Sequence, residues 1–552
     1  MKKSLVSLAA LALGTVATPG LAQDGSPAAP TPAASIATAP KLLVVISVDQ
    51  FSADLFAEYR NRFTGGFTRL LDGAVFPSGY QSHASTVTCV GHSTILTGMR
   101  PMHTGIVANS WIEYASPLED KKIYCVEDQN VPGSTSDDYT VSADNLKVPT
   151  LGERMKAANP ATRVVSVAGK DRSAVLMGGH KVDEMWWWDG KGFVTYAGRP
   201  TPPVVARVNA AVAAEIAEAQ PPMELPDYCR AKDRAIDVGG GKSVGTGRFA
   251  RAAGDVDGFY NSPAKDGATL ALAAGLIQSM KLGQGPQTDI IDIGASVTDH
   301  IGHKYGTEGT EMCLQLTSLD RDLGDFFKQL DAMGTDYAVV LTADHGGNDL
   351  PERERQQAMP MAQRIDKSFN PKAISDAVAA RLGLSGKLLA YSSGNFYVTP
   401  EVPAAKRAAV IAETKKALLA MPQVAAAFTA DEITASPDPA GPPDTWPLIM
   451  RARASYYKGR SGDLIVALKP LVTPIGDPTH GSVATHGSFW DYDRRVPILF
   501  WRKGMTGFEQ PHAVETVDIA PTLAALAHVD PGAPKMDGRC LDLDPGPGST
   551  CR

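Results

Sequence analysis

The sequence has no dense run of lysine and arginine, no Cys-x-x-Cys pair and, after its first residues, no long apolar stretch. With a net charge of −7 and no basic cluster, the chain is not expected to present a nucleic-acid-binding surface. The missing cysteine pairs argue against a zinc site built from thiolates. Because a membrane span needs about 20 apolar residues, no membrane segment is expected in the processed chain.

Composition places the chain among ordinary globular proteins. It is 43% hydrophobic and 20% charged, with 52 glycines and 40 prolines in 552 residues. These fractions are close to the average for folded soluble proteins and exclude a disordered or fibrous class. A chain of this length has room for several domains, or for one large α/β domain with insertions.

The N-terminus has the pattern of a secretory signal peptide. Two lysines follow Met1, residues 5–16 are mostly Ala, Leu and Val, and Thr18–Ala22 resembles a small-residue cleavage site. The apolar run is shorter than a membrane anchor requires. We therefore expect a signal peptide at 1–22, a Pro/Ala-rich linker at 23–40, and a mature protein in the periplasm or outside the cell.

Six cysteines allow 15 pairings in an oxidising compartment, and spacing alone does not choose among them. Cys540 and Cys551 enclose a short loop in the C-terminal tail, 531–552, and are the favoured pair. Cys125 with Cys229 is a second expectation. Cys89 and Cys313 lie in apolar-periodic stretches and are expected to be buried free thiols.

Strand-length apolar runs alternate with helical patterns along the chain. The expected strands are 42–48, 163–168, 289–293, 337–342, 463–468 and 496–501, and the expected helices include 150–158, 268–281, 311–333 and 404–420. This alternation predicts an α/β fold with a mostly parallel central sheet flanked by helices, over residues 41–530. Residues near 173–265 and 350–480 interrupt the pattern and are expected to be insertions or a cap subdomain.

Carboxylate and imidazole side chains follow several of the expected strands. They are Asp49, the Asp299–His303 segment, the Asp344-His345 pair and, late in the chain, His486. Function gathers at the carboxyl ends of parallel strands. Asp299 and His303 are four residues apart and share a helix face, as chelation needs. Asp and His without Cys suit zinc or a similar divalent ion in an open, catalytic site.

Two further segments point to an anionic substrate. Residues 86–98 resemble a loop entering a helix, where a hydroxyl faces the positive helix end; Ser85, Thr86, Thr88 and Cys89 are the candidates. Lys170 and Arg172 follow the 163–168 strand and can both reach a bound anion if the loop is extended. The competing interpretation is a pair of solvated loop charges.

These motifs, in this order, resemble the alkaline phosphatase superfamily, and within it the threonine-nucleophile, phosphate-insensitive, PafA-like bacterial enzymes. The resemblance covers residues 41–529. It is carried by Ser47-Val48-Asp49, Thr88…Gly91-His92, Asn109, Gly169-Lys170-Asp171-Arg172, Thr298–His303, Thr342–Gly346 and Thr485–Ser488.

The resemblance implies hydrolysis of phosphate monoesters through a phosphothreonine on Thr88, with two zinc ions as cofactors. One zinc ion would be held by Asp299, His303 and His486. The other would be held by Asp49, Asp344, His345 and Thr88. Asn109, Lys170 and Arg172 would contact the nonbridging phosphoryl oxygens. The Lys/Arg pair distinguishes these monoesterases from diesterase relatives.

Several alternatives stay open at this point. His480 lies in a second Thr-His-Gly-Ser motif and competes with His486 as a ligand. Cys89 lacks the Pro and Arg that follow a sulfatase cysteine and is disfavoured. The competing functions are a nucleotide pyrophosphatase or phosphodiesterase, and a non-catalytic, metal-stabilised anion-binding protein. The expected partners are small phosphate monoesters, the expected state is a monomer, and the carboxylate-rich loops leave room for an added calcium ion.

Overall fold

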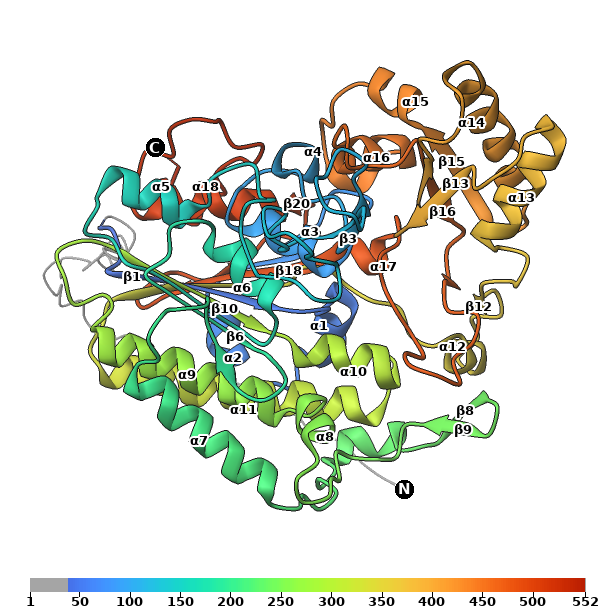
Figure 1. Ribbon diagram of the computed structural model, residues 1–552. Helices are drawn as coiled ribbons and strands as arrows, with labels where there is room; N and C mark the ends of the chain where they lie inside the picture. The colour runs from blue at the N-terminus through green and yellow to red at the C-terminus, as the bar shows by residue number, and fades with distance from the viewer. Residues whose placement is uncertain (1–37, 552) are drawn as a thin grey trace, which may run out of the picture.

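A central sheet of ten strands organises the molecule, seen here in a computed structural model that describes residues 38–551 (Figure 1). The expected signal peptide and most of the expected linker lie outside the described residues. The strand order is β19-β2-β18-β11-β1-β10-β5-β6-β7, with β20 beside β2. The bounds are β1 Leu42–Val48, β2 Ala74–Tyr80, β5 Val164–Ala168, β6 Glu184–Trp188, β7 Phe193–Val194, β10 Asp289–Ala295, β11 Tyr337–Thr342, β18 Arg495–Arg502, β19 Phe508–Glu509 and β20 Val514–Glu515.

The centre of this sheet is parallel, as expected from its continuous apolar strands. β1 pairs in parallel with β10 and β11, and β5 and β6 continue the parallel set. β18 runs antiparallel between β11 and β2. Every residue of β1 is buried, and alternate side chains enter two different apolar clusters, with Val44 and Ile46 in one and Leu43 and Val45 in the other. A strand covered on both faces needs no polar alternation.

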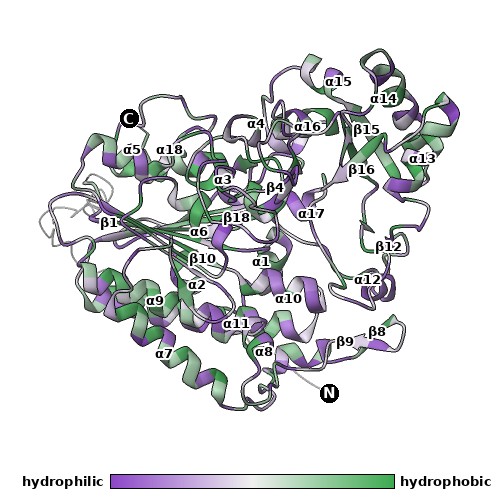
Figure 2. Cartoon of the chain, in the orientation of Figure 1, coloured by the Kyte–Doolittle hydropathy of each residue, from purple (hydrophilic) through white to green (hydrophobic). Residues whose placement is uncertain are grey.

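Helices cover both faces of the sheet (Figure 1). On one face lie α7 Pro203–Ala217, α9 Ala264–Met280 and α11 Thr310–Ala332. On the other lie α3 Thr88–Ile95, α5 Leu151–Ala158, α6 Asp171–Gly178 and α18 Ile519–Leu526. Hydrophobic residues line the central strands, whereas helix α10 (Val297–Tyr305) is largely hydrophilic although most of its residues are buried (Figure 2). Within residues 38–551, no helix has the length and apolarity needed to cross a membrane.

A smaller sheet forms a separate body beside the carboxyl edge of the main sheet (Figure 1). Its strand order is β13-β14-β16-β15, and it carries its own apolar cluster. Its elements are α13 Pro371–Leu382, β13 Leu389–Ser392, β14 Asn395–Val398, α14 Ala404–Leu419, β15 Val424–Thr429, α15 Ala430–Ala435, α16 Leu448–Ser455 and β16 Leu464–Leu468, flanked by the paired strands β12 Gln363–Arg364 and β17 Val472–Thr473. We call residues 363–473 the inserted subdomain.

Two sequence expectations about these regions need correction. The strand at 464–468 belongs to the inserted subdomain and not to the main sheet, because its partners are β14 and β15. The tryptophans at 186–188 lie in β6, so the start of the expected 173–265 insertion extends the main sheet instead of leaving it.

Short elements complete the chain. They are α1 Ala53–Tyr59, α2 Gly66–Leu71, α4 Pro101–Thr104, β3 Ser110–Ile112, β4 Lys122–Tyr124, a 3-10 turn at Asp227–Lys232, β8 Ile236–Gly239, β9 Lys242–Val244, α8 Val256–Tyr260, α12 Pro351–Gln356, a 3-10 turn at Pro443–Thr445, α17 Asp491–Arg494 and a 3-10 turn at Thr516–Asp518.

All six cysteines are paired in the structure. Cys540 is bonded to Cys551, the favoured pair. The other two bonds join Cys89 to Cys125 and Cys229 to Cys313. The expected Cys125–Cys229 bond is therefore wrong, and so is the expectation that Cys89 and Cys313 are free. Both residues are buried and apolar-flanked because their disulfides lie inside the two main clusters.

Candidate active site

The carboxyl ends of three adjacent parallel strands bring three aspartates together. Asp49 follows β1 directly, Asp344 follows β11 after one residue, and Asp299 lies in the first turn of α10, which follows β10. β1 lies between the other two strands, so these chain ends meet at one edge of the sheet. All three side chains are buried. Buried carboxylates need compensating positive charge.

Imidazoles complete two acidic groups at this edge. Asp49, His92 and Asp344 form one group, and Asp299, His345 and His486 form the other. In each group the three ligand atoms lie within 4.8 Å of one another. His303 joins the second group, because its Nε2 lies 3.3 Å from Asp299 Oδ1. His345 links the two groups, since its Nε2 is also 3.2 Å from Asp344 Oδ2.

The histidine tautomers are fixed by main-chain carbonyls. Nδ1 of His303 donates to the Ala484 carbonyl at 2.9 Å, and Nδ1 of His486 donates to the Thr86 carbonyl at 2.8 Å. Nδ1 of His345 similarly donates to the Gly346 carbonyl at 2.8 Å. A carbonyl only accepts, so each Nδ1 carries the proton and each Nε2 presents its lone pair to the carboxylates.

This donor set fits divalent cations. Several buried atoms at its centre have no hydrogen-bond partner, among them Asp299 Oδ1, Asp344 Oδ2 and His345 Nε2. Lone pairs that face one another in a buried site repel unless a cation lies between them. Oxygen and neutral nitrogen ligands without sulfur are typical of a catalytic zinc site. Burial also lowers the pKa of His303 to about 4, which keeps its imidazole neutral for coordination.

His92 is a member of this site that the sequence analysis did not single out as a ligand. It lies on α3, four residues after Thr88, and its Nδ1 is 2.9 Å from the Thr88 carbonyl. Its Nε2 is 3.3 Å from Asp49 Oδ1. Burial disfavours the imidazolium, but the carboxylates of Asp344 and Asp49 outweigh it and raise the pKa of His92 to about 10. The four-residue spacing that predicted a shared face for Asp299 and His303 applies equally to Thr88 and His92.

Thr88 begins helix α3 and is buried beside these groups. A glycine allows the helix to come this close to the metal-ligand loop. A Cβ on Gly91 would lie 1.8 Å from the Asp344 carbonyl oxygen, so any side chain there would push α3 away from the site.

Two of the three rival nucleophiles, Thr86 and Cys89, are already bonded to other groups. The Thr86 hydroxyl donates to the Ser488 carbonyl at 2.8 Å, and Cys89 is in a disulfide. Of the two competing histidines, His480 is exposed on a loop, whereas His486 Nε2 lies 3.3 Å from Asp299 Oδ1. The structure therefore places His486, and not His480, among the carboxylates.

Lys170 lies between the two acidic groups. Its Nζ is 2.7 Å from Asp49 Oδ2 and 2.6 Å from Asp299 Oδ2. Burial disfavours the ammonium, yet the carboxylates of Asp299 and Asp49 outweigh burial and hold the pKa of Lys170 above its ordinary value. Lys170 is thus a fixed cation at the centre of the site and not a solvated loop charge.

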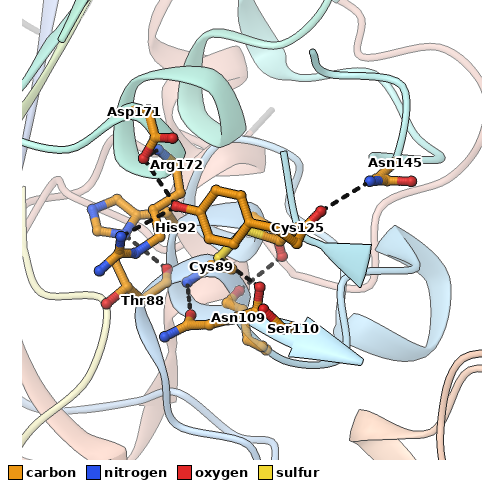
Figure 3. The surroundings of a disulfide bond; sticks show 12 residues. Thr88, Cys89, His92, Asn109, Ser110, Cys125, Asn145, Asp171 and Arg172 are labelled. Carbon is orange, nitrogen blue, oxygen red and sulfur yellow. Dashed lines mark hydrogen bonds between the residues drawn. A yellow bond between two sulfur atoms is a disulfide. The ribbon is translucent and has the colours of Figure 1, made fainter. Parts of the chain in front are cut away.

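Arg172, shown beside Asp171 in Figure 3, is held by a tyrosine brace formed by Tyr124 and Tyr139. The residue lies in the first turn of α6, not in an extended loop. Its Nη1 donates to the Tyr124 hydroxyl at 3.2 Å, and that hydroxyl donates to Asp171 Oδ1 at 2.9 Å. Tyr139 donates to the other Asp171 oxygen at 2.8 Å. Neither tyrosine was singled out by the sequence analysis, because no motif or charge pattern marks them.

Asn109 and the nearby disulfide connect this brace to Thr88 (Figure 3). Asn109 Oδ1 accepts the Cys89 N–H at 2.9 Å, which fixes the orientation of the amide beside the first turn of α3. Cys89 is bonded to Cys125, the residue after Tyr124. One covalent link therefore joins the Thr88 helix to the strand that positions Arg172.

The chain matches the family model described as type I phosphodiesterase / nucleotide pyrophosphatase over residues 43–489. It is 57% identical to the alkaline phosphatase PhoK of Sphingomonas sp over 93% of each chain. It is 46% identical to the alkaline phosphatase PhoD of Zymomonas mobilis, over 93% of this chain and 89% of that protein. The crystal structure of the alkaline phosphatase PafA superposes with a TM-score of 0.77 at 26% identity, covering 89% of this chain and 96% of PafA.

These similarities extend over nearly the whole described chain and agree with the fold and with the acidic, histidine-rich site at the strand ends. The chain belongs to the type I phosphodiesterase and nucleotide pyrophosphatase family, and within it to the PafA-like alkaline phosphatases, which are metal-dependent phosphomonoester hydrolases.

Proposed function

We propose that the protein hydrolyses phosphate monoesters through a phosphothreonine on Thr88, with two zinc ions bound by the two acidic groups. The observation that carries the proposal is the set of buried, unpartnered ligand atoms that converge beside Thr88, with Lys170 between them. Asp49, Asp344, His345 and Thr88 would hold one ion, and Asp299, His303 and His486 would hold the other. Zinc there supplies Lewis acidity and positive charge to the reacting oxygens.

The chain's own groups would act in two steps. The Thr88 oxygen attacks phosphorus, the bond to the leaving oxygen breaks, and the proton lost by the Thr88 hydroxyl is balanced by the proton that the departing alcohol takes up. Water then attacks the phosphothreonine, the bond between phosphorus and the Thr88 oxygen breaks, and one proton of the water restores the Thr88 hydroxyl as inorganic phosphate is released. Arg172, Lys170 and Asn109 would hold the nonbridging oxygens, which positions the phosphoryl group and stabilises its charge.

Charge balance favours a monoester over a diester. Two divalent cations exceed the charge of the three carboxylates of Asp49, Asp299 and Asp344, and Lys170 and Arg172 add two further cations. A site with this excess of positive charge favours a phosphate monoester dianion over a diester, which carries only one negative charge. Removing Lys170 or Arg172 should therefore cost a monoester more than a diester.

A solved variant of PafA supports this assignment of residues. Its substituted threonine and asparagine are 21 positions apart, and its substituted lysine and arginine are two positions apart. The same spacings separate Thr88 from Asn109 and Lys170 from Arg172. That variant is 25% identical to this chain with a TM-score of 0.78.

Substitution of Thr88 tests the mechanism. Thr88→Ala should abolish turnover of 4-nitrophenyl phosphate while bound zinc is retained, and Thr88→Ser should keep part of the activity and form an acid-stable phosphoserine. Full activity in Thr88→Ala would overturn the proposed nucleophile.

Comparing the hydrolysis of a monoester with that of a diester distinguishes a phosphomonoesterase from a phosphodiesterase. The description of the matching family favours the phosphodiesterase. Lys170→Ala/Arg172→Ala should lower kcat/KM for 4-nitrophenyl phosphate much more than for bis(4-nitrophenyl) phosphate. If wild type prefers the diester and the double change is harmless, the protein is a phosphodiesterase. Bound metal with no hydrolysis of any phosphate ester would instead support an anion-binding protein.

We further propose that the protein is exported and acts as a monomer, with calcium as an added structural ion. The signal-like N-terminus and three disulfides favour an oxidising compartment. Mass spectrometry of the protein from a bacterial periplasm should give an N-terminus at residue 23. Elemental analysis and sedimentation of the same sample measure its zinc, its calcium and its mass.

A further inference from the structure

A pocket opens between the catalytic edge of the main sheet and the inserted subdomain. Its volume is about 240 Å³. His486, a proposed metal ligand, lines it together with Val87, the residue before Thr88. The pocket therefore borders the catalytic centre at these two residues.

The inserted subdomain supplies an aromatic and aliphatic wall to this pocket. Phe369 and Tyr391 both line it, with ring centroids 6.3 Å apart and ring planes at 74°. Val466, Leu468 and Val472 lie on the same wall. Tyr391 is 39% exposed, one of the few large apolar side chains on the described surface that is not covered. An aromatic ring left uncovered beside a reaction centre is a ready contact for a flat organic group.

Charge distinguishes this pocket from the phosphoryl-binding side of the site. No lysine or arginine lines it, and its one carboxylate, Asp493, accepts the Ser488 N–H at 2.7 Å. Lys170 and Arg172 lie outside it. A second phosphate or a carboxylate on a substrate would meet no cation in this pocket. The free-energy cost of removing that anion from water would then not be offset by an ion pair.

From these observations we propose that the pocket binds the leaving group of the substrate and selects monoesters of uncharged aromatic or bulky apolar alcohols. The proposal rests on the function proposed above. The phosphoryl oxygens would face Lys170 and Arg172, and the ester group would extend past His486 toward Tyr391. Tyr391 is then a specificity residue that contacts the organic part of the substrate and not the reacting atoms.

Two pairs of substrates test this assignment. The first compares 2-naphthyl phosphate with methyl phosphate, which differ in the apolar group. The second compares phenyl phosphate with 4-carboxyphenyl phosphate, which differ in one charge. For each substrate, kcat/KM of a variant is divided by that of wild type, so the intrinsic reactivity of the ester cancels.

The variants change one exposed side chain. Tyr391→Ala should lower the naphthyl ratio threefold to tenfold, mainly through KM, and leave the methyl phosphate ratio within twofold. Tyr391→Phe should retain wild-type values because the ring remains. Tyr391→Lys should raise the 4-carboxyphenyl ratio relative to the phenyl ratio about twofold to fivefold. Leu419→Ala is the matched control, since Leu419 is an exposed apolar residue of the inserted subdomain outside the pocket.

The result that overturns the proposal is an equal effect of Tyr391→Ala on naphthyl and methyl phosphate, or no effect on either. Calorimetric binding of 2-naphthylmethylphosphonate and methylphosphonate separates this failure from failure of the proposed function. Suppose that wild type turns over no monoester but binds 2-naphthylmethylphosphonate more tightly than methylphosphonate, and that Tyr391→Ala removes this difference. The pocket proposal is then supported, and the proposed reaction is wrong. If binding does not depend on Tyr391, the pocket proposal falls.

Discussion

The disulfide between Cys89 and Cys125 ties two parts of the candidate site together, so its removal should lower both stability and activity. Cys89 follows Thr88 on α3, and Cys125 follows Tyr124, whose hydroxyl is bonded to Arg172 and to Asp171. The perturbation is the double variant Cys89→Ala/Cys125→Ala. Without the bond, the segment carrying Tyr124 can shift relative to Thr88, and Arg172 can shift with it.

Loop length gives the size of the stability loss. The two cysteines are 36 residues apart, which corresponds to about 4 kcal/mol of lost denatured-state constraint. A displacement of about 1 Å at a positioning group can lower a rate by roughly 100-fold. We therefore expect kcat/KM for 4-nitrophenyl phosphate to fall by about 10-fold to 100-fold.

The bond between Cys540 and Cys551 provides the matched control. It closes a loop of 11 residues in the C-terminal tail that includes no residue of the candidate site, so Cys540→Ala/Cys551→Ala should cost about 3 kcal/mol and leave kcat/KM unchanged. Urea denaturation measures the first quantity and initial rates under folding conditions measure the second. If the Cys89/Cys125 variant keeps wild-type kcat/KM after the expected loss of stability, the disulfide does not position Arg172 and the reasoning fails.

Three further predictions address single residues. Burial raises the pKa of Asp292 to about 8, so the folded state holds a proton that the unfolded state loses near pH 4. The free energy of unfolding should therefore fall by about 5 kcal/mol as pH rises from about 4 to 8. Asp292→Asn should reduce this pH dependence, which urea denaturation at several pH values measures. His486→Ala should weaken zinc binding more than about 100-fold by equilibrium dialysis, while His480→Ala leaves it unchanged; equal effects would remove His486 from the ligand set. Tyr124→Phe should lower kcat/KM for 4-nitrophenyl phosphate about threefold to tenfold, because Arg172 loses its hydroxyl acceptor, and should leave zinc content unaltered; wild-type kinetics would exclude the brace.

Much of the central sheet was predictable from the sequence. The buried parallel strands are continuous apolar runs, and β1 and β11 have the expected bounds. The strand at 464–468 has the same local pattern but pairs in another sheet. Local hydrophobicity indicates that a strand is buried and says nothing about which strands will be its neighbours.

The aspartates of the site were also predictable, because the ends of parallel strands meet at one edge of the sheet. Asp49, Asp299 and Asp344 each follow such a strand. His92 was missed because it lies on a helix whose closeness to Asp344 depends on Gly91, a packing feature that the sequence does not display. The cysteine pairs were missed for a similar reason, since 36 and 84 residues separate partners that only the tertiary fold brings together.

The orientation of the imidazoles is the least local property of the site. His303 is oriented by the carbonyl of Ala484, and His486, two residues later in that loop, is oriented by the carbonyl of Thr86. The Thr86 hydroxyl in turn donates to the carbonyl of Ser488. The segment before the nucleophile and the loop at 484–488 therefore fix each other, and the same loop fixes a histidine on α10. A shift of either segment would change the orientation of both His303 and His486. The geometry of these ligands therefore depends on contacts between residues up to 400 positions apart in the sequence, and not on the spacing within any motif.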